Sequence, residues 1–150
     1  MDYTRDNQTI ESKQYIVVRI GNEQYGIDIG YVDNIVRMQK ITRVPKVQTY
    51  FKGIINLRGE IVPVMSIRLK MGLENDEITN ASRVIILKIN DVGTIGIVVD
   101  EVWEVVELNE DNIETSYSGS NRTFIQGIGK NGNDLISILD IFTIIGEPEN

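Results

Sequence analysis

Alternation of apolar and polar residues is the dominant pattern of this 150-residue sequence. Runs rich in β-branched residues recur along the chain, and Gly, Asn or Asp residues separate them. A period of two is that of a strand with one buried face, and short strands about ten residues apart are typical of small barrels. The pattern predicts a mainly β (all-β) protein with strands at 15–20, 24–29, 60–67, 83–89, 94–100, 102–108 and 134–139, of which the run at 102–108 cannot be assigned by its period alone.

The apolar pattern also repeats within the chain. At an offset of 70 residues, Gly26-Ile27 and the apolar positions that follow fall on Gly96-Ile97 and their successors. At an offset of 74, Gly53-Ile54 falls on Gly127-Ile128, and the strand at 61–67 falls on 135–141. This internal duplication predicts two similar lobes of about five strands. A barrel of five short strands is filled by its own side chains, so function is expected on outer surfaces, loops or the seam between the lobes.

Shorter signals predict the connections and the ends of the domain. Segments 22–24 and 90–94 are expected to be hairpin turns. Residues 140–145 are expected to form a short closing helix, because their apolar positions fall near one helical face. We expect a flexible N-terminal tail at 1–12, one domain of two intertwined barrel lobes at 13–146, and a C-terminal tail at 147–150.

Composition places the chain among globular proteins. Hydrophobic residues make up 41% of it, which suffices for a core. The start has no basic region followed by an apolar run, and no segment approaches 18 uncharged apolar residues, so neither export nor direct membrane insertion is indicated. The absence of cysteine agrees with a reducing compartment. We therefore expect a cytoplasmic protein.

Charge is distributed unevenly along the chain. The net charge is −7, yet residues 37–70 hold eight Lys or Arg and one acid, whereas residues 100–114 hold seven acids and no base. Such an asymmetry can steer a partner of mixed charge, or it can belong to ordinary solvated faces.

Catalytic chemistry finds little support in the sequence. No histidine is present to act as a base near neutral pH. Asp100 and Glu101 are adjacent, so in a strand they point to opposite faces and are interpreted as surface acids. The G-x-G-x-x-G match at 127–132 precedes a strand rather than a helix, which favours a hairpin loop over a dinucleotide site. We expect no enzyme, no metal and no cofactor.

The basic segment at 37–46 supports an alternative function. A small β-barrel could bind nucleic acid through its four cations. The sequence pI of about 4.6 and the lack of clustered aromatic residues oppose this interpretation. The cations of this alternative are Arg37, Lys40, Arg43 and Lys46.

Trp103 lies among valines and is expected in the core or at the seam.

One stretch, GIINLRGEIVPV at 53–64, interrupts two apolar runs with charged residues. Arg58-Gly59 sits where a hairpin tip belongs, and Gly59 can adopt a positive φ. Arg58 is therefore expected to be exposed. A guanidinium on a rigid turn can donate several hydrogen bonds to a partner protein, or it can simply be a solubilising charge.

This stretch carries a family resemblance. FKGIINLRGEIVPV at 51–64, QYGIDI at 24–29 and GIVVDEV at 96–102 are similar to the CheW family, the coupling proteins of bacterial chemotaxis. The segment Asn-Leu-Arg-Gly, followed by an apolar-Val-Pro strand, is the most specific of these matches. The resemblance extends from Tyr15 to Ile145, close to the full chain.

The resemblance implies two SH3-like five-stranded barrels, no catalysis, and an adaptor that binds two partners at once. These are the regulatory domain of the histidine kinase CheA and the cytoplasmic tip of chemoreceptors (methyl-accepting chemotaxis proteins), at receptor arrays. Asn34 stands where the family often has Glu, and the sequence does not identify the kinase-contact patch. The positions that match receptor-contact sites of the family are Val32, Gly53, Arg58, Val102 and Val105.

Overall fold

The computed structural model describes residues 12–115 and 123–146 and consists mainly of strands. Its strands are β1 Ser12–Ile20, β2 Glu23–Asp28, β3 Val32–Arg37, β4 Phe51–Leu57, β5 Glu60–Ser66, β6 Arg83–Ile89, β7 Gly93–Val99, β8 Glu101–Asn109, β9 Ile113–Glu114, β10 Ile125–Asn131 and β11 Asp134–Leu139. Its short helices are η1 Ile29–Tyr31, α2 Ile67–Lys70, η2 Glu110–Asn112 and α3 Ile141–Ile145. The predicted tails lie outside the described residues, except that Ser12 begins β1.

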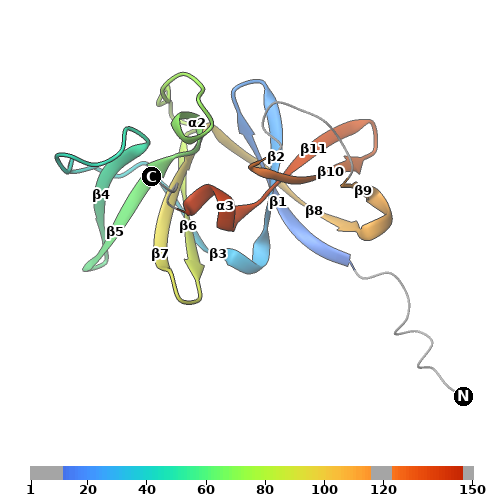
Figure 1. The fold of residues 1–150 in the computed structure, drawn as a ribbon, viewed down its shortest axis with the longest axis horizontal. Helices are drawn as coiled ribbons and strands as arrows, with labels where there is room; N and C mark the ends of the chain where they lie inside the picture. Colours follow the sequence, from blue (N-terminus) through green and yellow to red (C-terminus); the bar gives the residue numbers. More distant parts are fainter. Residues whose placement is uncertain (1–11, 116–122, 147–150) are drawn as a thin grey trace, which may run out of the picture.

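The strands form two sheets that lie side by side (Figure 1). One sheet has the order β8-β1-β2-β11-β10-β9 and is called barrel A. The other has the order β3-β6-β7-β5-β4 and is called barrel B. Two SH3-like barrels were expected from the sequence, and this fold class is confirmed. The two-residue strand β9 extends barrel A, and an isolated bridge between Thr42 and Ile54 takes the equivalent place in barrel B.

The two repeats exchange their opening strands. The first repeat contains β1 to β5, and the second contains β6, β7, β8, β10 and β11. Barrel A combines β1 and β2 of the first repeat with β8, β10 and β11 of the second, and barrel B has the opposite combination. Neither repeat therefore forms a barrel from its own strands, which is how the predicted lobes are intertwined.

In each barrel, one parallel strand pair joins a strand of the first repeat to a strand of the second. Strand β2 pairs with β11, where Gly26 lies opposite Ile138, and β7 pairs with β5, where Gly96 lies opposite Val64. A Cβ atom at Gly26 would lie 3.0 Å from the Ile138 side chain, and one at Gly96 would lie 2.8 Å from Val84. Both glycines thus leave room for aliphatic side chains in the barrel interior.

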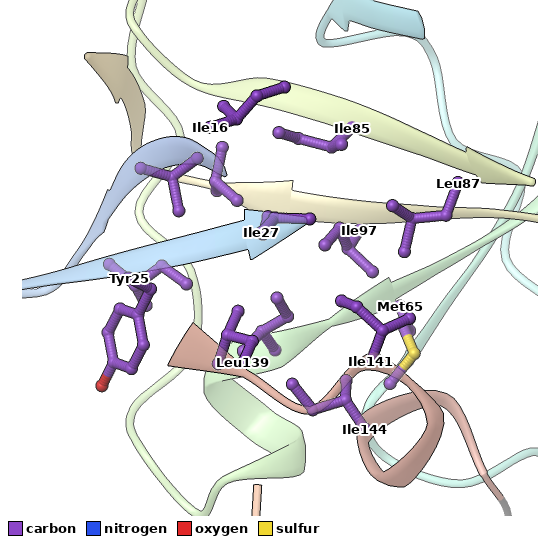
Figure 2. Close-up of a cluster of buried hydrophobic side chains, with 14 of the residues drawn as sticks. Ile16, Tyr25, Ile27, Met65, Ile85, Leu87, Ile97, Leu139, Ile141 and Ile144 are labelled. Atoms are coloured by element: carbon purple, nitrogen blue, oxygen red, sulfur yellow. The ribbon is translucent and has the colours of Figure 1, made fainter. Parts of the chain in front are cut away.

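Strands β1 and β6 are buried on both faces, which explains their continuous apolar runs. In β1, Tyr15 and Val17 pack inside barrel A, whereas Ile16 and Val18 point to the opposite face. That second face joins a central cluster between the barrels, to which both sheets contribute (Figure 2). Full burial of each such aliphatic side chain contributes about 1.5 to 3 kcal/mol. The barrels are therefore held together by a shared hydrophobic core.

The helices that follow β5 and β11 are equivalent and have equivalent caps. The Ser66 side chain accepts a hydrogen bond from the Leu69 amide, and Asp140 accepts one from the Thr143 amide. The predicted helix at 140–145 is confirmed. Phe142, which was expected on the apolar face of this helix, is 53% exposed, and Ile144, which was not, is fully buried.

The turns differ slightly from prediction. The first hairpin turns at Gly21 and Asn22 rather than at 22–24, because Gly21 supplies the left-handed backbone with a φ of 65°. The second turn lies at 90–92 and ends where Gly93 begins β7. The glycine-rich motif at 127–132 belongs to the hairpin of β10 and β11, as predicted.

Candidate partner-binding surface

Arg58 is presented on a tight hairpin turn between β4 and β5. Leu57 and Glu60 are paired, so Arg58 and Gly59 form a two-residue loop, with φ values of 54° and 85°. Positive φ at both positions is the geometry that fits the twist of a hairpin. The Asn56 side chain accepts a hydrogen bond from the Gly59 amide at 2.9 Å. The exposure predicted for Arg58 is confirmed, and the turn fixes its backbone.

Gly53 lies in β4 and is buried, so it offers no surface to a partner. Its φ is 139°, and a Cβ atom there would lie 2.2 Å from the carbonyl oxygen of Thr42. The Thr42 amide donates to the Ile54 carbonyl at 2.8 Å, and the Ile54 amide donates to the Thr42 carbonyl at 2.9 Å. Any effect of Gly53 on binding would therefore act through the backbone of this bridge.

Val32 and Val102 occupy equivalent places on two edge strands. Val32 begins β3 of barrel B, and Val102 follows the first residue of β8 in barrel A. Both are half-buried and pack against the central cluster between the barrels. These two positions, which the family resemblance indicated and which are 70 residues apart, therefore both lie at the seam. Arg58 and Gly53 belong to the β4–β5 hairpin, at the opposite edge of barrel B from β3.

Val105 lies further along β8 and is 51% exposed. Its partner on β1 is Ile16, and the partner of Val102 is Val18. Because Ile16 and Val18 both belong to the central cluster, Val102 and Val105 share that face of the strand. The face is covered at Val102 and open at Val105.

Trp103 was expected in the core or at the seam. It follows Val102 on β8, at the seam, but it is not buried, because 45% of it is exposed. Val17 is paired with Glu104 and Val18 with Val102, so Trp103 is an extra residue in β8 and forms a bulge. A bulge redirects a side chain, and a period-two pattern cannot show where one falls.

A buried carboxylate anchors the start of β8. Asp100 was expected to be a surface acid, but it is only 6% exposed. Arg68 of α2 donates to it through two nitrogen atoms, Arg19 lies 3.5 Å away, and the Gly21 amide donates at 2.8 Å. The hydrogen bond to Asp100 raises the pKa of Arg68 above its ordinary value. This cluster ties β1 and α2 to the junction of β7 and β8.

Glu101 continues the same network toward the surface. Arg19 donates to the Glu101 carboxylate at 3.2 Å. A hydrogen bond from the Trp103 side chain, together with that from Arg19, lowers the pKa of Glu101. The Glu101 carboxylate is therefore held by Arg19 and lies close to the Trp103 indole.

A second ion-pair group lies beneath the loop that follows α2. Lys52 of β4 lies 3.3 Å from Asp76, whose side chain is 1% exposed. Lys52 also donates to Asn75 at 3.1 Å, and Arg68 lies 4.0 Å from the other oxygen of Asp76. Arg68 thus faces one carboxylate on each side and links the two groups.

The basic segment runs from the end of β3 into the connection before β4. All four of its cations are exposed. Two hollows of about 320 and 280 Å³ adjoin the segment, and its residue Arg43 lines both of them. The residues that line both hollows are Arg43, Thr49, Phe51 and Lys52, and the cations of the segment are Arg37, Lys40, Arg43 and Lys46.

Membrane-spanning helices and metal-binding clusters are both absent from the described part of the chain. Within residues 12–115 and 123–146 there is no helix that is long and apolar enough to cross a membrane. The same residues include no group of three or more acidic, histidine or cysteine side chains arranged to hold a metal ion.

Known proteins with the same pattern and fold identify the family. The CheW-like domain family matches residues 14–149. The chain is 35% identical over 141 residues to the chemotaxis protein CheW of Bacillus subtilis, covering 92% of this chain and 90% of the relative. It is 34% identical over 144 residues to CheW of Helicobacter pylori, covering 93% and 84%.

A solved structure agrees with the sequence relatives. The crystal structure of scaffolding protein TtCheW from Thermoanaerobacter tengcongensis superposes with a TM-score of 0.81. The two chains are 32% identical, and the match covers 89% of this chain and 92% of that one. Sequence and structure thus agree over nearly the whole domain, and the chain belongs to the CheW family of non-catalytic chemotaxis scaffold proteins.

Proposed function

We propose that this chemotaxis scaffold couples chemoreceptors to the histidine kinase CheA. On this proposal, the domain at 13–146 binds the regulatory domain of CheA and the cytoplasmic tip of a chemoreceptor at the same time. It acts in the cytoplasm, at receptor arrays beside the membrane. The kinase-contact patch is left unassigned.

The observation that carries the proposal is the apolar face of β8. Val102 and Val105 share this face, and it passes from half-buried to open along the strand. A helix of the receptor hairpin can place apolar side chains on such a strip. Burial of a few valines contributes roughly 1.5 to 3 kcal/mol each before the costs of association, which agrees with micromolar affinity.

Arg58 supports the proposal as a second contact. Its guanidinium is exposed on a turn whose backbone is fixed, so the backbone loses little freedom when the side chain binds. A guanidinium presented in this way can donate to carboxylates or carbonyl groups of a helical partner and so set its register. Val32 and Gly53 complete the proposed receptor-binding set, Val32 through the seam and Gly53 through the backbone.

The test is co-sedimentation with receptor-containing membranes, with and without CheA, and pull-down of each partner separately. The wild-type protein is expected to sediment with the membranes and to increase the amount of CheA that does so. Arg58→Ala and Val102→Met are expected to lower receptor binding by about tenfold, the equivalent of roughly 1.4 kcal/mol. Leu135→Ala, which removes a side chain that is 61% exposed on β11, is the matched control and should bind normally.

Binding of neither partner by the folded wild-type protein would refute the proposal. The alternative, a nucleic-acid binder that uses residues 37–46, predicts salt-dependent retention of single-stranded oligonucleotides. The family assignment favours the scaffold, and the same purified protein serves for both measurements.

A further inference from the structure

The seam at the start of β8 carries an exposed tryptophan that the proposed receptor contacts do not explain. Trp103 is 45% exposed, and its neighbour Val105 is 51% exposed. β8 is an edge strand of barrel A in the described sheet. A large aromatic side chain left open on a free strand edge is typical of residues that dominate binding energy at protein interfaces.

The strand that carries Trp103 is held in place before any partner arrives. The bulge position of Trp103 in β8 leaves it without a paired residue on β1. Its neighbour Glu101 is paired with Arg19 at 3.2 Å, and Arg19 also reaches the buried Asp100. Because these contacts fix the start of β8, the backbone that carries the indole loses little freedom when a partner covers it.

The charge around Trp103 indicates what kind of partner fits. Asp100 and Glu101 are already paired with Arg68 and Arg19, but Glu104 is exposed between Trp103 and Val105, and Glu107 is exposed further along β8. An apolar side chain of a partner would cover the indole, and basic side chains beside it would face the acids. A helix with an apolar stripe flanked by Lys or Arg has this combination.

We infer that Trp103 is the anchor residue of the receptor-binding surface, and that it packs against an apolar helix face flanked by basic residues on the receptor tip. The inference rests on the proposed function and adds to it a residue and a requirement on the partner. Covering the indole would extend the apolar strip of Val102 and Val105 by its largest side chain. The acids of β8 would then select receptors by charge.

Intrinsic fluorescence tests this directly, because Trp103 is the only tryptophan of the chain. The probe is a tryptophan-free cytoplasmic fragment of a chemoreceptor, added to the full-length protein. Binding is expected to shift the emission to shorter wavelength and to protect the indole from acrylamide. A tryptophan-free regulatory domain of CheA, added alone, should cause neither change. The reporter control is the double variant Trp103→Phe with Val92→Trp, because Val92 is 57% exposed at the β6–β7 turn of barrel B. The emission of the new tryptophan at position 92 should stay constant when the receptor fragment is added.

Affinity gives an independent measurement. Trp103→Ala is expected to weaken binding of the receptor fragment by about 30-fold or more, the range of an interface hot spot. Trp103→Phe should retain part of the affinity, and Val92→Ala should leave it unchanged. Raising NaCl from about 0.05 to 0.5 M should weaken wild-type binding more than binding of Glu104→Gln, because salt screens the charge attraction.

The outcomes separate this inference from the proposed function. If the receptor fragment binds but Trp103 remains open to acrylamide and Trp103→Ala binds normally, the anchor inference is wrong while the proposed function survives. If CheA instead of the receptor protects the indole, the assignment to the receptor is wrong. If the fragment does not bind the folded protein at all, both fail together.

Discussion

At the scale of single residues, backbone geometry decides the role of Gly53. Its φ of 139° is a conformation that side chains rarely adopt, and the space for a Cβ is occupied by the Thr42 carbonyl at 2.2 Å. Strain of about 1 to 3 kcal/mol and a steric cost of similar size should add, so Gly53→Ala is expected to cost more than about 3 kcal/mol. Urea unfolding followed by circular dichroism measures this.

Gly21 supplies the control for that experiment. Its φ is 65°, but nothing lies within 4 Å of the position that a Cβ atom would take, so Gly21→Ala meets strain without a clash. Its cost is expected to be about 1 to 2 kcal/mol. Equal losses of stability for the two variants would show that the bridge between Thr42 and Ile54 shifts to make room for the new side chain. A direct role for Gly53 in the partner-binding surface would then regain support.

Residue-scale prediction from sequence succeeded where local chemistry decides the outcome. The Arg58-Gly59 tip was predictable because Gly tolerates positive φ and polar residues favour turns. Asp100 was misplaced and the exposure of Trp103 was not predicted, because the surroundings of both residues come from distant segments. The burial of Asp100 depends on Arg68, which is 32 positions away, and the exposure of Trp103 depends on a bulge against β1. Neither the burial of Asp100 nor the exposure of Trp103 can be recognised from the neighbouring residues in the sequence.

At the scale of elements, the Asp100 cluster joins strands to a helix. Breaking a buried ion pair leaves an uncompensated charge, and such losses are typically about 3 to 5 kcal/mol. Asp100→Asn is therefore expected to destabilise the fold by about 3 kcal/mol, because the carboxylate that then remains beside Arg68 is that of Asp76, at 4.0 Å. Denaturant unfolding of the variant, compared with wild type, gives this difference.

A double-mutant cycle checks that the loss comes from the ion pair. Arg68→Met removes the charge and keeps most of the apolar stem, so it should recover part of the stability lost in Asp100→Asn. The expected coupling between positions 68 and 100 is about 1 to 3 kcal/mol. Additive losses would mean that Asp100 acts mainly through Arg19 and the Gly21 amide.

Element-scale prediction was limited both by strand identity and by strand pairing. The alternating pattern located β1, β2, β5, β6, β7, β8 and β11, whereas β3, β9 and β10 were not predicted and β4 was recognised only as an apolar run. The closing helix at 140–145 was recognised from its apolar spacing. The ambiguous run at 102–108 proved to be part of β8. A period of two says that a face is buried but not which strand lies alongside, so the parallel pairs β2–β11 and β5–β7 could not be derived.

At the scale of the whole molecule, the exchange of strands makes each repeat depend on the other. The duplication was visible in the sequence and two intertwined lobes were expected, but the duplication does not say which strands are exchanged. In the structure, β6 and β7 of the second repeat lie between β3 and β5 of the first. A fragment that ends before β6 therefore lacks the middle of barrel B.

This arrangement predicts the behaviour of the two halves. Cutting the chain between Asn80 and Ala81, in the connection before β6, should give fragments that do not fold alone, because the central cluster draws on both repeats. Mixed in equal amounts, they should associate and regain β structure with a cooperative, concentration-dependent unfolding transition. Circular dichroism of each fragment and of the mixture is the measurement. A cooperative thermal transition in fragment 1–80 by itself would show that one repeat can close its own barrel, and the exchanged topology would then not be what stabilises the molecule.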